Sequence, residues 1–534
     1  MHNARWLRCV NVRAQLDSFS PRTRPRQNRS MDDLKKKTLQ GLMYLGVGKG
    51  VSKLISFAGT LVLARLLSPE DYGLMALVMV VVGIIGFFNE IGLGSAIKQR
   101  PQVTQSQLNG CFTLSLLISA GLYGALYAFS PAIAAFYEND SLAPVLRFIA
   151  LTFIIGAVVT VPDAMMARDM QFKLFAGIDF TMIMLQTAVT LLLAWMGLGV
   201  WALAWGFVLS QIFKSVSIFY FSGWRPSRLG EVSAALDLMR FGVTVTYSRI
   251  TWYFYNTAQT LIIGKTLNTQ AVGIYSMADT LASLPTMHIT SLLIRVASPL
   301  FSKMQHDLNR LNNTLLRLTS GIALINYPVM VGMALTASEL VPVVLGPQWL
   351  EVTLPLQILC MVGLVKSIDP LLTQALTSSG QVNVTARYTS LCAVTIPTSI
   401  YFGSILGGLP GAAIAMAVAY PLTSIFLFLA VRRYLGLSLI QYLKAVRLPV
   451  EACIWMATIV LGTSQLLAAF GLDNAALMLA TKALLGVFSY VFFMIYVRPA
   501  GLRECHEVLS ELGVSSQRLQ RWPFSRLGLH DTGK

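Results

Sequence analysis

Long apolar runs recur from about residue 41 to residue 497, and short polar segments separate them. A helix that crosses a bilayer needs about 20 mainly apolar residues. Fourteen segments of the chain meet that requirement: 41–67, 73–95, 111–136, 145–167, 175–197, 199–222, 240–265, 271–300, 318–345, 353–377, 386–407, 409–431, 446–470 and 475–497. Only 12% of the residues are charged, against about 25% in soluble domains. The sequence therefore predicts an all-α polytopic membrane protein.

Basic residues gather in alternate segments between these runs. One set contains Lys and Arg, as at Lys35 to Lys37, Arg168 and Arg225, whereas the other set, such as "SPEDYG" and "GGLPG", has almost none. Basic loops stay on the cytoplasmic side of a membrane. With fourteen spans, both termini are expected in the cytoplasm. The net charge of +17 is then explained by membrane lipids and an anionic substrate, and we expect no nucleic acid partner.

The chain resembles itself at an offset of about 200 residues. "LVLARLLSPEDYG" at Leu61 is echoed by "LIIGKTLNTQAVG" at Leu261, and Gly197 has its counterpart in Gly408. The repeat predicts two six-helix lobes, 31–222 and 240–433. An even number of helices per lobe gives both lobes the same orientation, with a substrate path between them as in two-lobed transporters.

The remaining segments complete the expected organisation. Residues 223–239 form a basic connector along the cytoplasmic interface, 434–497 a terminal helix pair, and 498–534 a cytoplasmic tail. Residues 1–30 are Arg-rich and acid-poor, and they lack the apolar core of a secretory signal. We interpret them as a disordered or untranslated extension before Met31; the alternative is an organelle transit peptide.

Cations inside the spans are candidate functional groups, because an ionisable residue in a membrane is costly unless it faces a cavity or a partner. Lys49 and Lys53 lie four residues apart, on one helix face, and Arg249 follows Lys49 by 200 positions. We assign Lys53 and Arg249 to the wall of a central cavity, with Lys49 behind them; the alternative is snorkelling towards the cytoplasmic headgroups. Arg65 and Lys265, at helix ends, are expected to anchor those ends by snorkelling.

Acidic and amide side chains inside the spans are fewer. Glu90 and Asp279 are candidates for an ion or proton relay. Lys366 and Asp369 are three residues apart on one helix, and we expect them to neutralise each other. Asn256 and Gln259 either line the path or link helices by hydrogen bonds.

Enzyme chemistry has no signature in this sequence. The six cysteines are scattered, mostly within apolar runs, without C-x-x-C or Cys/His clusters. "GVGKG" at Gly46 lacks the length and strand context of a phosphate-binding loop. We therefore expect no enzyme activity, no bound metal and no cofactor.

Two motifs resemble a known family. "LVLARLLSPEDYGLMALV", followed by "FFNEIGLGSAIKQRP", is similar to the first two helices of Wzx-type polysaccharide exporters in the multidrug/oligosaccharidyl-lipid/polysaccharide superfamily. "LIIGKTLNTQAVGIYSMADTL" resembles the seventh and eighth helices of the same proteins. The resemblance covers most of residues 40–433.

This resemblance implies a V-shaped flippase of the bacterial inner membrane. Its substrate would be a polyprenyl-pyrophosphate-linked oligosaccharide, and a polysaccharide polymerase and export machinery would be partners. Cations of the first and seventh helices would face a positive cavity, the role we assign to Lys53 and Arg249. Relatives often have an acidic residue just before "LIIG", where this chain has Gln259. A coupling mechanism that needs a carboxylate there is therefore in doubt.

Three other functions remain open at this point. A drug/cation antiporter of the same superfamily would favour carboxylates in its cavity instead of cations. A polysaccharide polymerase or a glycosyltransferase usually has a sizeable extramembrane loop, and no segment between the spans is long enough for one. A membrane scaffold without transport activity would leave the duplicated intramembrane cations unexplained.

Overall fold

The computed structural model describes residues 55–90, 94, 97–98, 103–227, 230, 253–469 and 474–497. Within these ranges the regular structure is helical, without a strand. Ten described helices are long and apolar enough to cross a membrane, and a shorter apolar helix covers Ile55–Leu66. The predicted fold class is confirmed, and the count of fourteen spans stays a prediction.

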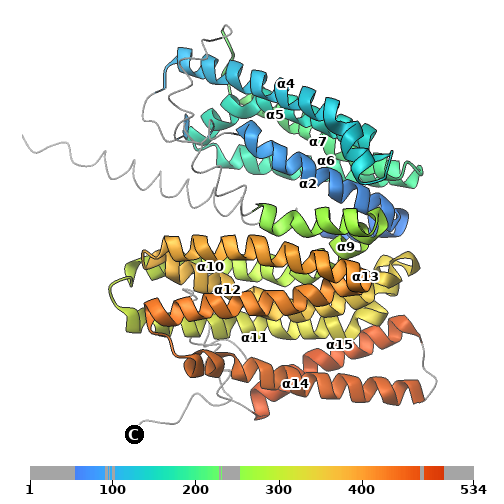
Figure 1. Ribbon diagram of the computed structural model, residues 1–534, viewed down its shortest axis with the longest axis vertical. Helices are drawn as coiled ribbons and strands as arrows, with labels where there is room; N and C mark the ends of the chain where they lie inside the picture. The colour runs from blue at the N-terminus through green and yellow to red at the C-terminus, as the bar shows by residue number, and fades with distance from the viewer. Residues whose placement is uncertain are drawn as a thin grey trace, which may run out of the picture.

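The N-terminal bundle consists of the helix Ile55–Leu66 and five longer helices at one end of the molecule (Figure 1). These are α2 (Pro69–Glu90), α4 (Gln105–Phe136), α5 (Leu142–Arg168), α6 (Phe172–Trp195) and α7 (Val200–Phe221). Of the expected connector 223–239, residues 223–227 and 230 are described, and they are not helical.

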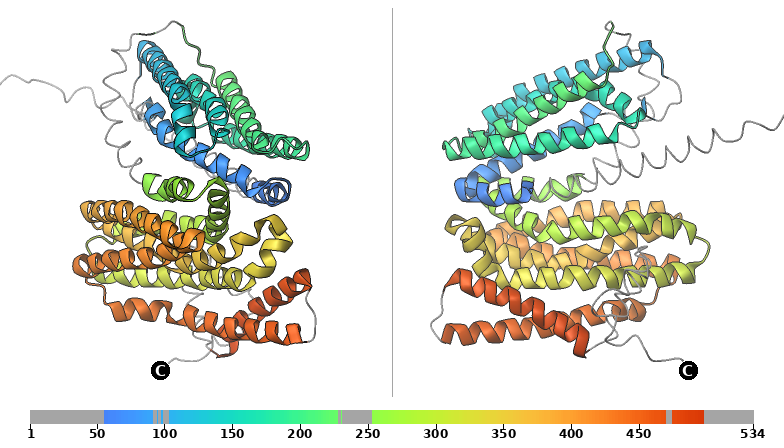
Figure 2. Two further views of the ribbon diagram at one scale, coloured as in Figure 1. Left: turned by 45° about the vertical axis from the view of Figure 1, so that its right-hand side comes forward. Right: turned by 180° about the vertical axis from the view of Figure 1, so that it is seen from behind.

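The C-terminal bundle follows, with the terminal helix pair at the far end of the molecule (Figures 1 and 2). The bundle comprises the helix 253–266, α9 (Thr269–Pro285), η1 (Thr286–Thr290), α10 (Ser291–Lys303), α11 (Leu308–Leu340), η2 (Val341–Leu345), η3 (Pro347–Val352), α12 (Thr353–Ser378) and α13 (Val382–Leu435). The terminal pair is α14 (Leu439–Ala469) and α15 (Ala475–Phe492), the latter continued by η4 (Phe493–Val497).

Helix α13 contains two of the expected spans, 386–407 and 409–431. Its backbone leaves the helical conformation at Gly407 and Gly408, where Gly408 has φ 59° and ψ −145°. A residue with a side chain adopts a positive φ only with strain, which explains why glycine occupies this position. The predicted turn at "GGLPG" is therefore present as a break between two helical segments.

The "SPEDYG" segment is the start of α2 and not a loop, so the expected start at residue 73 was wrong. Ser68 Oγ accepts a hydrogen bond from the Asp71 backbone N–H at 3.2 Å, and Asp71 Oδ2 accepts one from the Ser68 N–H at 3.0 Å. This is a capping box, and Pro69 occupies the first helical position, where no N–H is needed. In the repeat, Asn268 caps α9 by accepting from the Ala271 N–H at 2.7 Å.

The two bundles meet where α2 crosses α9 (Figure 1). A Cβ at Gly73 would lie 1.8 Å from the Thr269 carbonyl oxygen, and a Cβ at Gly273 would lie 1.8 Å from the Pro69 carbonyl oxygen. The helices are therefore in backbone contact, as small residues allow in membrane proteins. These two glycines occupy equivalent positions of the repeat, so the crossing is nearly symmetric.

Candidate functional site

The predicted cavity cations lie outside the described residues: Lys49, Lys53 and Arg249 all fall in undescribed segments. Glu90 is the last residue of α2, and its side chain is not among the described ones. Asn256, Gln259 and Asp279 are described, and the site is built from them.

Asp279 is the centre of a polar cluster in the C-terminal bundle. Gln259 Nε2, on the helix 253–266, donates to Asp279 Oδ2 at 3.4 Å. Lys366 Nζ, on α12, lies 3.6 Å from Asp279 Oδ1. Two predicted residues, Gln259 and Asp279, are therefore in contact. The third member of the cluster is Lys366, which was expected to pair with Asp369. Asn256 is half-buried one turn before Gln259, on the same helix.

The expected pair between Lys366 and Asp369 was wrong. Asp369 is only 3% exposed and accepts a hydrogen bond from Ser424 Oγ of α13 at 2.7 Å. Side chains three residues apart on a helix differ in direction by about 60°. Lys366 therefore reaches α9 while Asp369 reaches α13. Ser424 lies 55 residues after Asp369 in the sequence, so no local spacing could predict it as the partner of Asp369.

A small pocket adjoins the Asp279 carboxylate and the Lys366 ammonium. Its wall also includes Ser283 and Thr286, which follow Asp279 on the same helical segment. At Thr286 the α-helix passes into the π-helical turn η1, and such turns occur frequently at functional sites. The Asp279 and Lys366 side chains are 27% and 26% exposed. The site therefore presents a carboxylate, an ammonium and hydroxyl groups to a partly open space beside α9.

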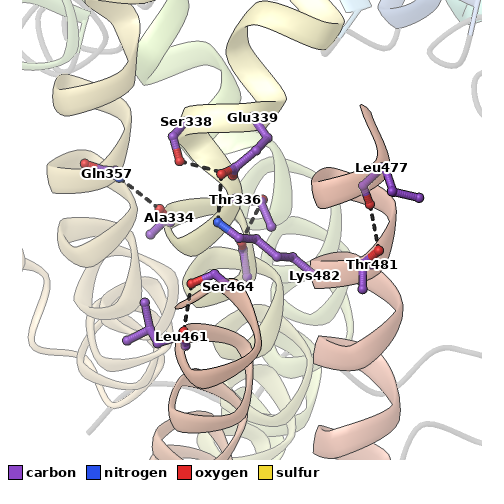
Figure 3. A network of polar contacts seen from close by, with 11 residues as sticks. Ala334, Thr336, Ser338, Glu339, Gln357, Leu461, Ser464, Leu477, Thr481 and Lys482 are labelled. Carbon is purple, nitrogen blue, oxygen red and sulfur yellow. Dashed lines mark hydrogen bonds and ion pairs between the residues drawn. The ribbon is translucent and has the colours of Figure 1, made fainter. Parts of the chain in front are cut away.

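A second ion pair of this half is nearly closed to solvent, although Lys482 also borders a larger, mainly apolar pocket between α11, α14 and α15. Lys482 Nζ of α15 lies 2.7 Å from Glu339 Oε1 of α11, and the two side chains are 8% and 12% exposed. Ser338 Oγ donates to the other carboxylate oxygen at 3.1 Å (Figure 3). Sequence analysis missed both residues, although both lie in predicted spans. The rule that selected Asp279, an ionisable group inside a span, also selects them.

Two acidic residues of the N-terminal bundle are also paired. Lys214 of α7 lies 3.0 Å from Asp179 of α6, and Lys98 lies 2.9 Å from Asp163 of α5. Each pair joins different segments of the bundle. Among the described residues, no group of three or more His, Cys, Asp or Glu side chains is placed to hold a metal ion.

The sequence matches a protein family and several characterised proteins. The model of a family described as polysaccharide biosynthesis protein matches residues 62–354. The lipopolysaccharide biosynthesis protein WzxC of Escherichia coli (strain K12) is 23% identical, with 78% of this chain and 85% of WzxC covered. The succinoglycan biosynthesis transport protein ExoT of Rhizobium meliloti (strain 1021) is 24% identical, with 84% and 91% covered. The teichuronic acid biosynthesis protein TuaB of Bacillus subtilis (strain 168) is also 24% identical, with 77% and 85% covered.

Solved structures share the fold. The lipid II flippase MurJ in its inward closed conformation superposes with a TM-score of 0.69 at 14% identity, covering 86% of this chain and 99% of MurJ. An inward-facing multidrug resistance transporter of the MATE family gives a TM-score of 0.56 at 15% identity, covering 74% and 98%. The chain therefore has the fold of these two multi-pass membrane transporters.

Proposed function

Since the match at residues 62–354 covers more than half of its 534 residues, the chain belongs to the polysaccharide biosynthesis protein family, and we propose that it is a lipid-linked oligosaccharide flippase. It moves polyprenyl-pyrophosphate-linked repeat units across the bacterial cytoplasmic membrane for exopolysaccharide, lipopolysaccharide or capsule synthesis. The family membership carries this proposal. Relatives that align over most of their length are named for the synthesis of surface polysaccharides, one of them as a transport protein.

The diphosphate headgroup sets the main physical requirement on such a transporter. Moving an unpaired anion through a low-dielectric region is heavily penalised, and Lys or Arg form strong charge-assisted bonds to phosphate oxygens. Lys53 and Arg249, with Lys49 behind them, are our candidates for this role from the sequence. In this proposal they line a central path between the two bundles, which opens alternately to each side of the membrane.

Asp279 is our candidate for an ion or proton relay, with Glu90 as a second one. What supports Asp279 is its position between an amide and an ammonium group, 3.4 Å from Gln259 and 3.6 Å from Lys366, beside a partly open pocket. A carboxylate with such partners can exchange one of them during a cycle without being left unpaired. Asn256 and Gln259 supply polar lining on the adjacent helix.

The proposed topology places both termini in the cytoplasm, with "SPEDYG" and "NTQAVG" on the outer side. It follows from the basic residues of alternate segments. A polysaccharide polymerase and the export machinery would receive the translocated units, and membrane lipids surround the chain.

Deletion of the gene tests the proposal. We expect surface polysaccharide to be lost while lipid-linked repeat units accumulate on the cytoplasmic leaflet, as measured by leaflet-specific labelling of the sugars. Units that still reach the outer leaflet at the normal rate would contradict the proposal. A drug/cation antiporter, the alternative transporter, predicts instead unchanged polysaccharide and increased sensitivity to cationic compounds. A polymerase predicts single units that accumulate on the outer leaflet.

A further inference from the structure

Arg65 does not only anchor its own helix end, because it contacts the opposite bundle. It is the penultimate residue of the helix Ile55–Leu66, and its Nε donates to the Val344 carbonyl oxygen at 3.2 Å. Its Nη2 donates to the carbonyl oxygen of Val343. Both acceptors lie in η2, the π-helical turn that directly follows α11. The expectation of simple snorkelling was therefore incomplete: the guanidinium has specific acceptors 278 and 279 residues away.

Side chains of the C-terminal bundle also donate hydrogen bonds to the helix that contains Arg65. Trp349 Nε1 donates to the Ala64 carbonyl oxygen at 2.6 Å, and Gln348 Nε2 donates to the same oxygen at 2.9 Å. Trp349 is fully buried, and its ring lies 5.3 Å from that of Tyr72 in an edge-on arrangement. The last carbonyl groups of a helix lack partners within the helix. Here Gln348 and Trp349 of the C-terminal bundle are hydrogen-bond donors to such a carbonyl group, that of Ala64.

Lys265 makes the equivalent contact in the reverse direction. It lies near the end of the helix 253–266, and its Nζ donates to the Phe136 carbonyl oxygen at 2.8 Å and to Glu138 Oε1 at 3.0 Å. Phe136 ends α4 of the N-terminal bundle. The carbonyl end of a helix attracts cations. Each bundle thus provides one cation that binds the C-terminal end of a helical segment in the other bundle, α11 with η2 for Arg65 and α4 for Lys265.

These contacts surround the crossing of α2 and α9. Asn139 Nδ2, next to Glu138, donates to Thr269 Oγ1 at 3.1 Å, and Thr269 contacts Gly73. The reciprocal contacts and the backbone crossing therefore lie at the same ends of the helices, which the proposed topology assigns to the outer side. Side chains of Arg65 and Lys265 remain partly exposed. Interactions at such positions are weak enough to break within a transport cycle.

We propose that Arg65 and Lys265 are two halves of a reciprocal latch that holds the outer side of the transporter closed. This inference rests on the proposed function for its place in the cycle. Release of both cations separates the bundles at α2 and α9 and opens the path outwards. The latch explains why the repeat has a cation at both Arg65 and Lys265, since each of them binds the opposite bundle.

The distance between the outer ends of the bundles tests the latch. Trp195 ends α6, and Leu406 lies at the break in α13; the two side chains are 75% and 85% exposed. Spin labels are introduced there through unnatural amino acids, so that the native cysteines stay, and the full chain is reconstituted in liposomes. Pulsed electron paramagnetic resonance then measures the fraction of molecules with a long distance between the labels.

We expect R65A and K265A each to raise the long-distance fraction about fivefold, and the double variant to raise it tenfold or more. The R65K variant keeps a charged donor and should remain near the parent. The exposed Arg447 pairs with Glu451 of its own helix, so R447A is the matched control. An unchanged distribution in the double variant would overturn the latch, and so would an equal change in R447A.

The measurement separates this inference from the proposed function. The same liposomes are loaded with a lipid-linked oligosaccharide, and its movement between leaflets is followed. If the distance changes as expected but the parent chain moves no substrate, the latch stands and the flippase proposal fails. If the parent moves substrate but the double variant stays closed, the latch fails and the flippase proposal stands.

Discussion

The two ion pairs of the C-terminal half combine the same chemical groups in different surroundings. Lys482 and Glu339 are 2.7 Å apart, with 8% and 12% of their side chains exposed. Lys366 and Asp279 are 3.6 Å apart, with 26% and 27% of their side chains exposed. The first pair fixes the terminal helix α15 to α11. The second joins α12 to α9, the helix in contact with the N-terminal bundle. The pairs therefore differ in the exposure of their ionic groups, and we infer that the less exposed pair stabilises the fold while the more exposed pair takes part in transport.

Breaking the closed pair should have the largest effect on stability. K482A leaves the Glu339 carboxylate buried without its ammonium partner, and we expect the free energy of unfolding to fall by about 3–5 kcal/mol. Denaturation of the purified chain in detergent measures this. The double variant K482M/E339L removes both charges and should recover most of the loss. A double variant as unstable as K482A would show that the pair is not the cause.

Breaking the open pair should instead reduce transport. In K366A the Asp279 carboxylate keeps only the Gln259 amide, and we expect the flipping rate to fall about tenfold, or about 1.4 kcal/mol in the barrier. Protein abundance and the unfolding midpoint should change much less than in K482A. The K366R variant keeps the charge and serves as the control. Equal losses of stability in K366A and K482A would remove the distinction between the two pairs.

The pair on α14, with 67% of the Arg447 and 29% of the Glu451 side chain exposed, gives the baseline. Arg447 Nε lies 2.6 Å from Glu451 Oε1, four residues away on the same helix. A pair of this kind contributes only about 0.3–0.5 kcal/mol. R447A should therefore leave both unfolding and flipping within experimental error of the parent. A clear loss in either assay would mean that the exposure of an ion pair does not determine how much it contributes to stability or transport.

Most of the described helices could be predicted from apolar runs, because crossing a bilayer imposes a minimum length on each helix. Their starts were less accurate. The polar "SPEDYG" was interpreted as a loop, yet its Ser68 and Asp71 cap α2 and extend that helix to Pro69. Polar residues such as Ser and Asp are favoured at helix starts as well as in loops. The two uses differ in backbone geometry, which the pattern of apolar residues does not contain.

Side-chain partners were predicted less well than helices. Lys366 was assigned to a neighbour on its own helix, but it pairs with Asp279 on α9. Arg65 was expected to reach the membrane surface, but its acceptors belong to η2. In each case the sequence showed that an ionisable residue inside an apolar run needs a partner, since an unpaired charge there is costly. Its partner came from another helix, and helix packing rather than local spacing decides that choice.

The flippase proposal is tested by the rate at which a polyprenyl-pyrophosphate-linked oligosaccharide moves between the two leaflets of liposomes that contain the purified chain. We predict rapid movement with the parent chain, a large loss in K53A and R249A, and retention of most activity when each cation is exchanged for the other type, as in K53R and R249K. Movement no faster than in protein-free liposomes would contradict the flippase proposal, and full activity in the K53A/R249A double variant would contradict the role of the two cations.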